Sequence, residues 1–309
     1  MAGYKLATYK TPDGPRAGLV IDDRLFDAAK LTGKPAYTSV LAILEDWRAA
    51  QAILKKAAAA AAGKSRVKSI PVSRAKLTAP VRWPSAIYCA GANYADHAAE
   101  MARRMNRPLE PDPHTQGLKA WHFIKAARTL TDPGATVKVS GLSDKVDWEV
   151  ELAAVIGRPA KNVPPEKALQ YVAGYTAAND LSARDRGPRA NISDTSPFKA
   201  DWTKHKTFDG SCPLGPWIVP ASDIRDPQNL GLKLWVNDVL KQDSNSKDMI
   251  FNLAEQIAQL SNGMTLHPGD IILTGTPAGV GSARGEFLKP GDTVKIWIEK
   301  IGTLTNKIA

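Results

Sequence analysis

Short apolar runs separated by Gly/Pro turns dominate the chain from about Leu77 to its end. The turns Pro268-Gly269-Asp270 and Pro290-Gly291-Asp292 each precede such a run, Ile271–Leu273 and Val294–Ile298. This spacing is typical of strands joined by tight turns. The body is therefore predicted to be mainly β, with its few helices at residues 95–105, 165–171 and 247–261, the last having apolar residues at helical spacing.

The first 78 residues have a different character. Residues 4–27 are predicted to form short strands broken by a Pro/Gly turn at 11–15, and residues 38–62 a helix that ends at Gly63. The last turns of that helix hold six alanines with little apolar side chain to bury, which favours an exposed element. We predict two units, a small N-terminal α+β domain over residues 1–78 and a larger domain over residues 79–309.

The composition is that of an ordinary globular protein. Of its 309 residues, 43% are hydrophobic and 23% charged, and no apolar run reaches the length of roughly 20 residues needed to cross a bilayer. The first ten residues lack the apolar stretch of a secretory signal, so a cytoplasmic location is expected. Cys89 and Cys212 could form at most one bridge and are expected to be buried thiols.

The net charge of +10 raises the question of nucleic-acid binding. Residues 1–80 hold 14 Lys or Arg against 6 Asp or Glu, which leaves an excess of only two positive charges in the rest of the chain. That basic segment lacks the zinc, helix-turn-helix and aromatic-strand patterns of nucleic-acid modules. A solvated basic face is favoured, and neither a nucleic-acid nor a membrane partner is expected.

Two glutamates, Glu149 and Glu151, interrupt the otherwise apolar strand-like segment Val146–Leu152. Alternate residues of a strand share one face. Two like charges on a half-buried face repel each other and are costly to desolvate unless a positive charge lies between them. Mg²⁺, Mn²⁺ or Ca²⁺ suits carboxylate oxygens, whereas the alternative is a pair that faces solvent or meets Lys and Arg.

Asp180 follows the apolar segment 171–179, where a strand is expected to end. A third carboxylate at that point could complete one face of an octahedral site. Mg²⁺ commonly keeps positions for water or substrate, so three protein carboxylates leave room for a bidentate ligand. The predicted site is therefore catalytic in type.

His97 and Glu100 lie three residues apart on a predicted helix and share one helical face. The carboxylate would hold the imidazole tautomer and leave the other ring nitrogen to act as a base. The alternative is an ordinary surface pair.

Lys206 lies between Trp202 and Phe208 and could place its ammonium beside a developing oxyanion, the alternative being that it lies over those rings. The glycine-rich segment 274–281 could present backbone N–H groups to a carboxylate. It lacks the Gly-Lys-Ser/Thr of a P-loop.

Together these residues resemble the fumarylacetoacetate hydrolase family. Its members carry a Glu-x-Glu strand, a later Asp, an Asn-Tyr-x-x-His-x-x-Glu segment and a Thr-Gly-Thr-Pro-x-Gly-Val-Gly turn. All four patterns occur here in family order, and the resemblance covers about residues 80–306. It implies a fold that is mainly β with α+β elements, an incompletely closed β-roll preceded by a small N-terminal domain and usually dimeric.

The resemblance also implies roles for single residues. Mg²⁺ or Mn²⁺ is expected on Glu149, Glu151 and Asp180, with His97, Glu100 and Lys206 as catalytic residues. Thr276, Lys125 and Tyr94 are assigned to substrate binding. The expected partner is a small 2-oxo acid, and the expected assembly is a homodimer.

Departures from the family pattern occur at several positions. Gly187 stands where many members have Gln, and Ala90 where some have a fourth carboxylate ligand. Ala92 stands where larger residues are frequent. The Met-, Arg- and Pro-rich stretch 101–121 is a candidate lid that would set substrate choice.

The activity predicted from the resemblance is metal-dependent hydrolysis of a carbon–carbon bond in an acylpyruvate or diketo acid, with His97 activating water. The alternative is a decarboxylase, isomerase or dehydratase that uses the same metal and enolate chemistry. A non-catalytic or nucleic-acid-binding protein is the third hypothesis, and salt-dependent binding to DNA or RNA without turnover of a keto acid would favour it.

Overall fold

The computed structural model describes residues 3–64 and 66–309. Met1, Ala2 and Ser65 belong to the predicted N-terminal domain but lie outside the described residues. Its largest sheet has twelve strands, and the path β4-β3-β2-β1-β14-β12-β11-β17-β6-β7 ends in an open edge on each side, with β5 on β1 and β8 on β14. The strands of this sheet are β1 Lys5–Thr11, β2 Gly14–Ile21, β3 Arg24–Asp27, β4 Ser69–Pro71, β5 Leu77–Thr78, β6 Ile87–Ala90, β7 His122–Lys125, β8 Leu130–Thr131, β11 Val150–Ile156, β12 Val172–Asn179, β14 Cys212–Pro220 and β17 Ile271–Leu273.

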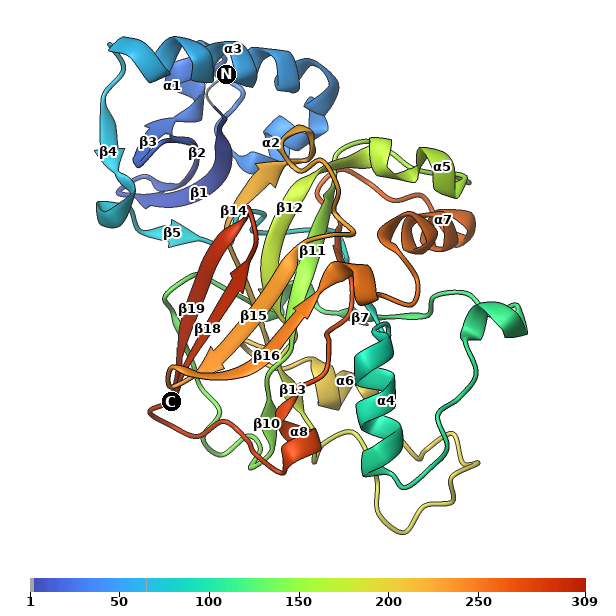
Figure 1. Cartoon of the computed structure of the whole chain (residues 1–309). Helices are drawn as coiled ribbons and strands as arrows, with labels where there is room; N and C mark the ends of the chain where they lie inside the picture. Colours follow the sequence, from blue (N-terminus) through green and yellow to red (C-terminus); the bar gives the residue numbers. More distant parts are fainter. Residues whose placement is uncertain (1–2, 65) are drawn as a thin grey trace.

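A second sheet of five strands has the order β16-β15-β18-β19-β9 and lies across β11 and β12 (Figure 1). Its strands are β9 Thr136–Val137, β15 Gly231–Val236, β16 Val239–Asn245, β18 Thr293–Ile298 and β19 Gly302–Ile308. A short pair, β10 Val146–Asp147 and β13 Ser182–Ala183, lies below them. The prediction of a mainly β, incompletely closed roll is confirmed.

The helices lie around these sheets, and α3 is the longest of those that the structure describes (Figure 1). They are α1 Ala28–Thr32, α2 Val40–Glu45, α3 Trp47–Lys64, α4 Ala95–Arg104, α5 Pro165–Ala168, α6 Trp202–Lys206, α7 Leu253–Gly263 and α8 Gly281–Arg284. Short 3₁₀ turns are η1 Val72–Arg74, η2 Pro113–Gln116, η3 Ala127–Thr129, η4 Leu169–Tyr171, η5 Ala221–Asp223 and η6 Ser246–Asp248. Within the described ranges, none of the helices has the length and apolarity that crossing a membrane requires.

Helix α4 and the α5–η4 pair agree with the predicted helices at 95–105 and 165–171. The prediction of one helix over 247–261 was wrong at its start, because α7 begins only at Leu253. Asn252 caps it: its side chain accepts from the backbone N–H of Glu255 (3.0 Å), and the Glu255 carboxylate accepts from the Asn252 N–H (2.8 Å). Met249, counted in the helical pattern, instead forms a β-bridge with Tyr94.

The predicted helix over 38–62 is two helices, α2 and α3, separated at Asp46. Asp46 accepts a hydrogen bond of 2.5 Å from the Tyr37 hydroxyl, a contact that no helical period reveals because Tyr37 precedes both helices. The alanine-rich end of α3 is not simply exposed, since Ala58 and Ala61 are buried. Small side chains let this helix approach the N-terminal strands closely.

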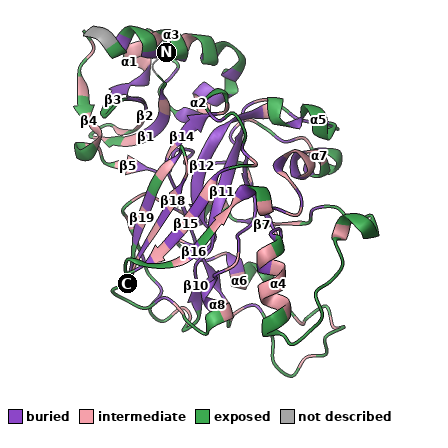
Figure 2. Ribbon diagram, viewed as in Figure 1, coloured by how far each residue is buried: buried purple, intermediate pink, exposed green. Residues whose placement is uncertain are grey.

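Strand β11 has buried residues on both faces (Figure 2). Leu152, Ala154 and Ile156 face the core between the two sheets, whereas Ala153 and Val155 face a second core. This second core also holds side chains of the N-terminal segment, such as Leu19. A strand covered on both sides reads as a continuous apolar run, which is why carboxylates at its start are unusual.

The N-terminal segment is bonded to the rest of the chain through β1, whose Leu6 pairs with Ile218 of β14. Trp47, at the start of α3, packs where Gly157 has no side chain: a Cβ on Gly157 would lie 2.6 Å from the indole Cδ1. The large sheet and the second core therefore contain residues from both sides of position 78. The predicted boundary between two domains at residues 78 and 79 stays a proposal.

We predict that Trp47→Ala destabilises the protein by about 3–5 kcal/mol, because it removes a buried aromatic ring between α3 and the central sheet. Urea unfolding of the whole chain measures this. Trp83→Ala is the control, since that side chain is 59% exposed and its loss is expected to cost about 0.5 kcal/mol or less. Equal effects of the two substitutions would contradict the proposed packing role.

Candidate metal centre

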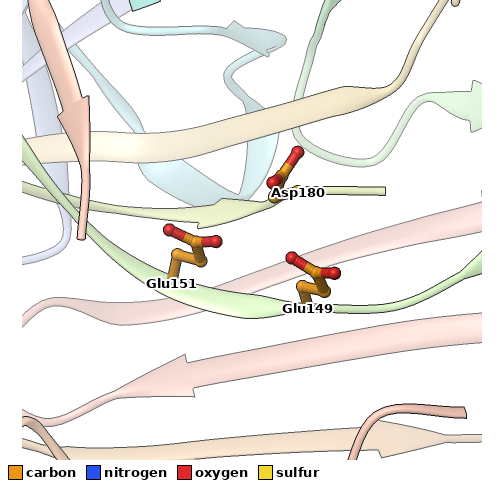
Figure 3. A group of neighbouring side chains, drawn as sticks. All are labelled: Glu149, Glu151 and Asp180. Carbon is orange, nitrogen blue, oxygen red and sulfur yellow. The ribbon is translucent and has the colours of Figure 1, made fainter. Parts of the chain in front are cut away.

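The pairing of β11 with β12 brings three carboxylates onto one face of the sheet. Val150 lies opposite Asn179, and the Asp180 N–H donates to the Glu149 carbonyl at 3.0 Å, so Asp180 stands across from Glu149. Glu151 follows on the same face, two residues along. Figure 3 shows the two glutamates pointing to the same side, with Asp180 on the neighbouring strand. One oxygen from each of the three groups lies within 4.8 Å of the others.

The strand that carries the glutamates is interrupted, not continuous as predicted for Val146–Leu152. Strand β10 ends at Asp147 and β11 begins at Val150. Side chains replace the ladder in between: the Glu149 N–H donates to the Asn179 amide oxygen and the Val150 N–H to the Gln242 amide oxygen, both at 2.9 Å. These two amides satisfy the backbone of a buried break and fix where the glutamates point.

Two lysines lie directly on these carboxylates. The Lys206 ammonium donates to Glu149 at 2.8 Å and to Asp180 at 2.6 Å. From the other side, the Lys125 ammonium donates to Asp180 at 2.6 Å and to the Leu181 carbonyl at 3.1 Å. Both lysines are buried, so these are fully desolvated ion pairs. The Lys206 ammonium also lies 5.2 Å from the Phe123 ring centroid. Its predicted role beside a developing oxyanion stays a prediction.

An arginine joins the centre to a fourth carboxylate. The Arg184 guanidinium donates to Glu149 at 2.5 Å and to Asp147 at 2.8 Å. Sequence analysis assigned no role to Asp147, although it stands two residues before Glu149 in the same segment. The alternation of Asp147 with Glu149 was a signal that could have singled out Asp147. Its partner Arg184, 37 residues further along the chain, could not be predicted from the sequence.

The two glutamates differ in their electrostatic surroundings. Burial acts to raise the pKa of Glu149, but Lys206 and Arg184 outweigh it and hold that pKa below its ordinary value. Burial raises the pKa of Glu151 well above its ordinary value, and Asp180 and Glu149 raise it further. Of the residues that the structure describes, no Lys, Arg or His forms an ion pair with Glu151. A divalent cation therefore fits this donor set, since it would supply the positive charge that Glu151 lacks.

The glycine-rich turn over 274–281 links the carboxylates of the site. Its backbone N–H groups donate to three of them, from Gly275 to Glu151 at 2.6 Å, from Gly279 to both oxygens of Glu100 at 3.0 Å, and from Gly281 to Asp147 at 2.6 Å. Gly279 has φ +99°, and a Cβ there would lie 2.1 Å from the Lys241 carbonyl oxygen. Only glycine fits this backbone. The expectation that the turn presents N–H groups to a carboxylate agrees with these contacts.

His97 and Glu100 lie on α4 with the histidine Nδ1 3.5 Å from a Glu100 oxygen. Burial acts to raise the pKa of Glu100, but the hydrogen bonds from His97 and Gly279 outweigh it, so that pKa is lowered and the group is a carboxylate. His97 is itself buried and contributes to the lowered pKa of Glu149, which places it near the candidate metal ligands. The alternative of a surface pair does not fit this burial.

The three residues assigned to substrate binding have different surroundings. The Thr276 hydroxyl accepts from the Gln242 amide at 2.9 Å, at the edge of the glycine-rich turn. Lys125 has a structural contact with Asp180 that the sequence did not foretell, and Tyr94 is fully buried in the core between the sheets. Their assignment to the substrate stays a prediction.

The candidate lid, residues 101–121, leaves the end of α4 and contains η2. His114 lies in η2 and bridges Asp112 and Glu255, at 2.9 and 3.0 Å. The segment is thereby held against α7. Its role as a lid stays a prediction.

Comparison with known proteins agrees with this geometry. Residues 86–309 match the family described as Fumarylacetoacetate (FAA) hydrolase C-terminal. The human protein named "Oxaloacetate tautomerase FAHD2B, mitochondrial" is 39% identical over 267 residues, which cover 86% of this chain and 78% of the human one. A Xenopus laevis relative with the name "Oxaloacetate tautomerase fahd2, mitochondrial" is 41% identical over 238 residues, covering 76% of this chain and 69% of its own.

Solved structures share the fold over nearly the whole chain. Maleylpyruvate hydrolase from Sphingobium sp. SYK-6, in complex with manganese (II) ion and pyruvate, has a TM-score of 0.74 and 30% identity, covering 99% of this chain and 98% of that one. Fumarylacetoacetate hydrolase from Exiguobacterium antarcticum has a TM-score of 0.75 and 28% identity, covering 99% of both chains. The family match, the relatives and the shared fold lead to one conclusion: this chain belongs to the fumarylacetoacetate hydrolase family.

Proposed function

We propose that this protein is a divalent-cation-dependent enzyme that moves a proton at the carbon next to the oxo group of a small 2-oxo acid, with keto–enol tautomerisation of oxaloacetate as its reaction. One observation carries the proposal: a single glycine-rich turn is bonded to both the His97–Glu100 dyad on α4 and the carboxylate centre on β11. Its Gly279 N–H donates to Glu100, and its Gly275 N–H donates to Glu151. The names of relatives at 39–41% identity support the choice of oxaloacetate.

His97 is the proposed proton carrier. Glu100 faces its Nδ1, which leaves Nε2 to take a proton from the substrate carbon or enol oxygen and to return it to the other atom. The two Gly279 hydrogen bonds hold the Glu100 carboxylate in place while the imidazole changes charge. The dyad thus moves one proton within one substrate molecule and needs no water.

Lys206 is the proposed electrostatic partner of the oxygen that becomes negative. Its ammonium is already oriented by Glu149 and Asp180, so little reorganisation is needed when charge develops beside it. Mg²⁺ or Mn²⁺ held by Glu149, Glu151 and Asp180 would supply Lewis-acid stabilisation of the same charge.

Hydrolysis of a carbon–carbon bond, the activity predicted from the sequence, is the second candidate. The His97–Glu100 dyad could equally deprotonate a water molecule, and the maleylpyruvate hydrolase of 30% identity favours this reading. Both reactions place negative charge on the oxo oxygen, so the same Lys206 and metal ligands serve either one. The difference lies in whether water attacks a second carbonyl.

A substrate panel separates the two reactions. Purified protein with Mg²⁺ or Mn²⁺ is given enol-oxaloacetate, acylpyruvates and maleylpyruvate. Ultraviolet absorbance follows enol loss, and a coupled assay follows pyruvate release. Enol loss without carbon–carbon cleavage supports the tautomerase. Pyruvate release from acylpyruvates supports the hydrolase, and no turnover of any 2-oxo acid would overturn both.

We predict that His97→Ala lowers turnover of the confirmed substrate by about 10²–10⁴, the usual contribution of a positioned general base. Steady-state kinetics with saturating Mg²⁺ measures it. His267→Ala, which changes an exposed histidine, is the matched control and should keep wild-type turnover. Wild-type rates for His97→Ala would show that another group carries the proton.

We predict opposite effects of Glu151→Gln with and without metal. Without metal the variant should be at least as stable as the wild type, because a neutral amide replaces a buried carboxylate that has no cationic partner within the described chain. With Mn²⁺ at about a hundredfold excess over its Kd, the wild type should gain about 2.7 kcal/mol and the variant much less.

Thermal unfolding with and without Mn²⁺ measures both effects of Glu151→Gln. Glu166→Gln is the control, since Glu166 is exposed and should leave the Mn²⁺ response unchanged. An Mn²⁺ response of Glu151→Gln as large as that of the wild type would remove Glu151 from the ligand set.

We further propose a homodimer and a cytoplasmic location. Light scattering after size exclusion tests the first, and cell fractionation the second. The relatives' names place those proteins in mitochondria, so a mitochondrial location here would correct the expectation.

A further inference from the structure

Four aromatic rings form a wall beside Lys206: Trp121 at the end of the candidate lid, Phe123 on β7, and Trp202 and His205 on α6. Trp202 lies at the centre, with ring centroids 5.4 Å from each of the other three. The Phe123 ring centroid lies 5.2 Å from the Lys206 ammonium, which itself touches Glu149 and Asp180. The aromatic wall therefore adjoins the metal centre.

Two glycines make room for this wall. A Cβ on Gly91 would lie 2.0 Å from the Trp121 ring, and a Cβ on Gly187 would lie 2.9 Å from the His205 Cβ and 3.0 Å from its ring. Neither distance is compatible with a side chain at the glycine. His205 thus occupies the volume that a residue at 187 would need, and Gly187 is one of the positions where this sequence departs from the family pattern.

His205 Nε2 is buried and has no hydrogen-bond partner among residues 3–64 and 66–309. Leaving a buried ring nitrogen unpaired is unfavourable, and native structures usually satisfy such an atom with a protein group, water or ligand. Burial lowers the pKa of His205 to about 3, with Lys206 and Arg184 acting in the same direction. The imidazole is therefore neutral at physiological pH and can carry one N–H donor.

The charged groups with the largest effects on His205 include three cations. These are Lys206, Arg184 and Lys125, and the Glu149 carboxylate acts in the opposite direction. Two nitrogens of the Arg184 guanidinium, Nε and Nη2, already donate to Asp147 and Glu149 respectively. His205 Nε2 is thus a donor on this side that no protein carboxylate uses.

His205 and Lys206 are consecutive residues of one helical turn, so their side chains leave the helix about 100° apart. Lys206 points to the carboxylates of the metal centre. The His205 side chain would therefore contact a different part of an acid bound at the carboxylate centre, further from the proposed metal ligands.

We propose that His205 is a specificity-determining residue, whose Nε2–H donates to the second, distal carboxylate of a 2-oxo dicarboxylic acid bound at the metal centre. The proposal rests on the proposed function, since it assumes that the 2-oxo end of the acid lies at Glu149, Glu151 and Asp180. Trp202 fixes the imidazole plane, and the room left by Gly187 fixes its position.

The first test compares binding of oxaloacetate and pyruvate, two 2-oxo acids that differ by the distal carboxylate. Calorimetric titration of the whole chain with Mg²⁺ gives both Kd values. His205→Phe keeps a ring between Trp202 and Gly187 but removes both nitrogens. It should weaken oxaloacetate binding about tenfold to a hundredfold, the value of a hydrogen bond to a charged group, and pyruvate binding less than about threefold.

His205→Gln retains an N–H donor and should keep oxaloacetate binding within about threefold of the wild type. Lys204→Ala, on the same helix with an exposed side chain, is the control and should change neither Kd. Urea unfolding of each variant separates loss of binding from loss of folding.

A reciprocal pair of variants tests the shared volume. Gly187→Gln alone should destabilise the protein, because its Cβ meets the imidazole. In the double variant Gly187→Gln/His205→Gly the clash is gone, and the amide can donate from the opposite side. The double variant should bind oxaloacetate more tightly than His205→Gly alone.

The outcomes are distinct. Equal losses for pyruvate and oxaloacetate in His205→Phe, or no loss for either, would overturn the specificity role while leaving the proposed function standing. If the wild type neither binds nor turns over any 2-oxo acid with Mg²⁺, the proposed function fails and this inference fails with it.

Discussion

The register of β11 against β12 places Glu149 opposite Asp180, in a sheet that is covered by apolar side chains on both faces. Carboxylates buried in this way are stable only with compensating charge, because the cost of removing them from water exceeds that of an ordinary polar group. Lys125, Lys206 and Arg184 supply most of that charge. Glu151 forms no ion pair with any residue that the structure describes, and this imbalance favours a cation site over a fully satisfied ion-pair network.

The glycine-rich turn fixes the helix α4 and the strand β11 relative to each other. It joins Glu151 of β11 to Glu100 of α4 through backbone donors that carry no charge and cannot change rotamer. A helix that carries the proposed base is thereby fixed relative to a strand that carries the proposed metal ligands. Such preorganisation is what proton transfer next to a developing oxyanion requires.

The chemistry of this centre does not choose among the reactions of the family. Tautomerisation and carbon–carbon hydrolysis both begin with a 2-oxo acid whose oxygen takes up negative charge, and both can use His97 as base. What differs is expected to lie beyond the proposed metal ligands, where the rest of the substrate would be held. Our candidate for that region is the aromatic wall of Trp121, Phe123, Trp202 and His205, which Gly91 and Gly187 accommodate.

Much of the site could be predicted from the chain. Glu149 and Glu151 stand out because a period of two places them on one face of an apolar run, and His97 and Glu100 because a helical period brings them together. The mainly β class followed from runs and turns of the same local kind. Periodicity failed where a distant group intervened: Asn179 and Gln242 interrupt the strand before Val150, and Met249 pairs with Tyr94 instead of starting a helix.

Residue types and local spacing therefore determined the class of fold, the carboxylates and the candidate base, since each depends on neighbours a few positions away. Only the tertiary structure decided which cation pairs with which carboxylate, that Glu151 forms no ion pair within residues 3–64 and 66–309, and that His205 fills the space beside Gly187. The reason is physical: these properties arise from contacts between residues 18 to 134 positions apart, such as His205 with Gly187 and Gly281 with Asp147, and from the loss of water around them.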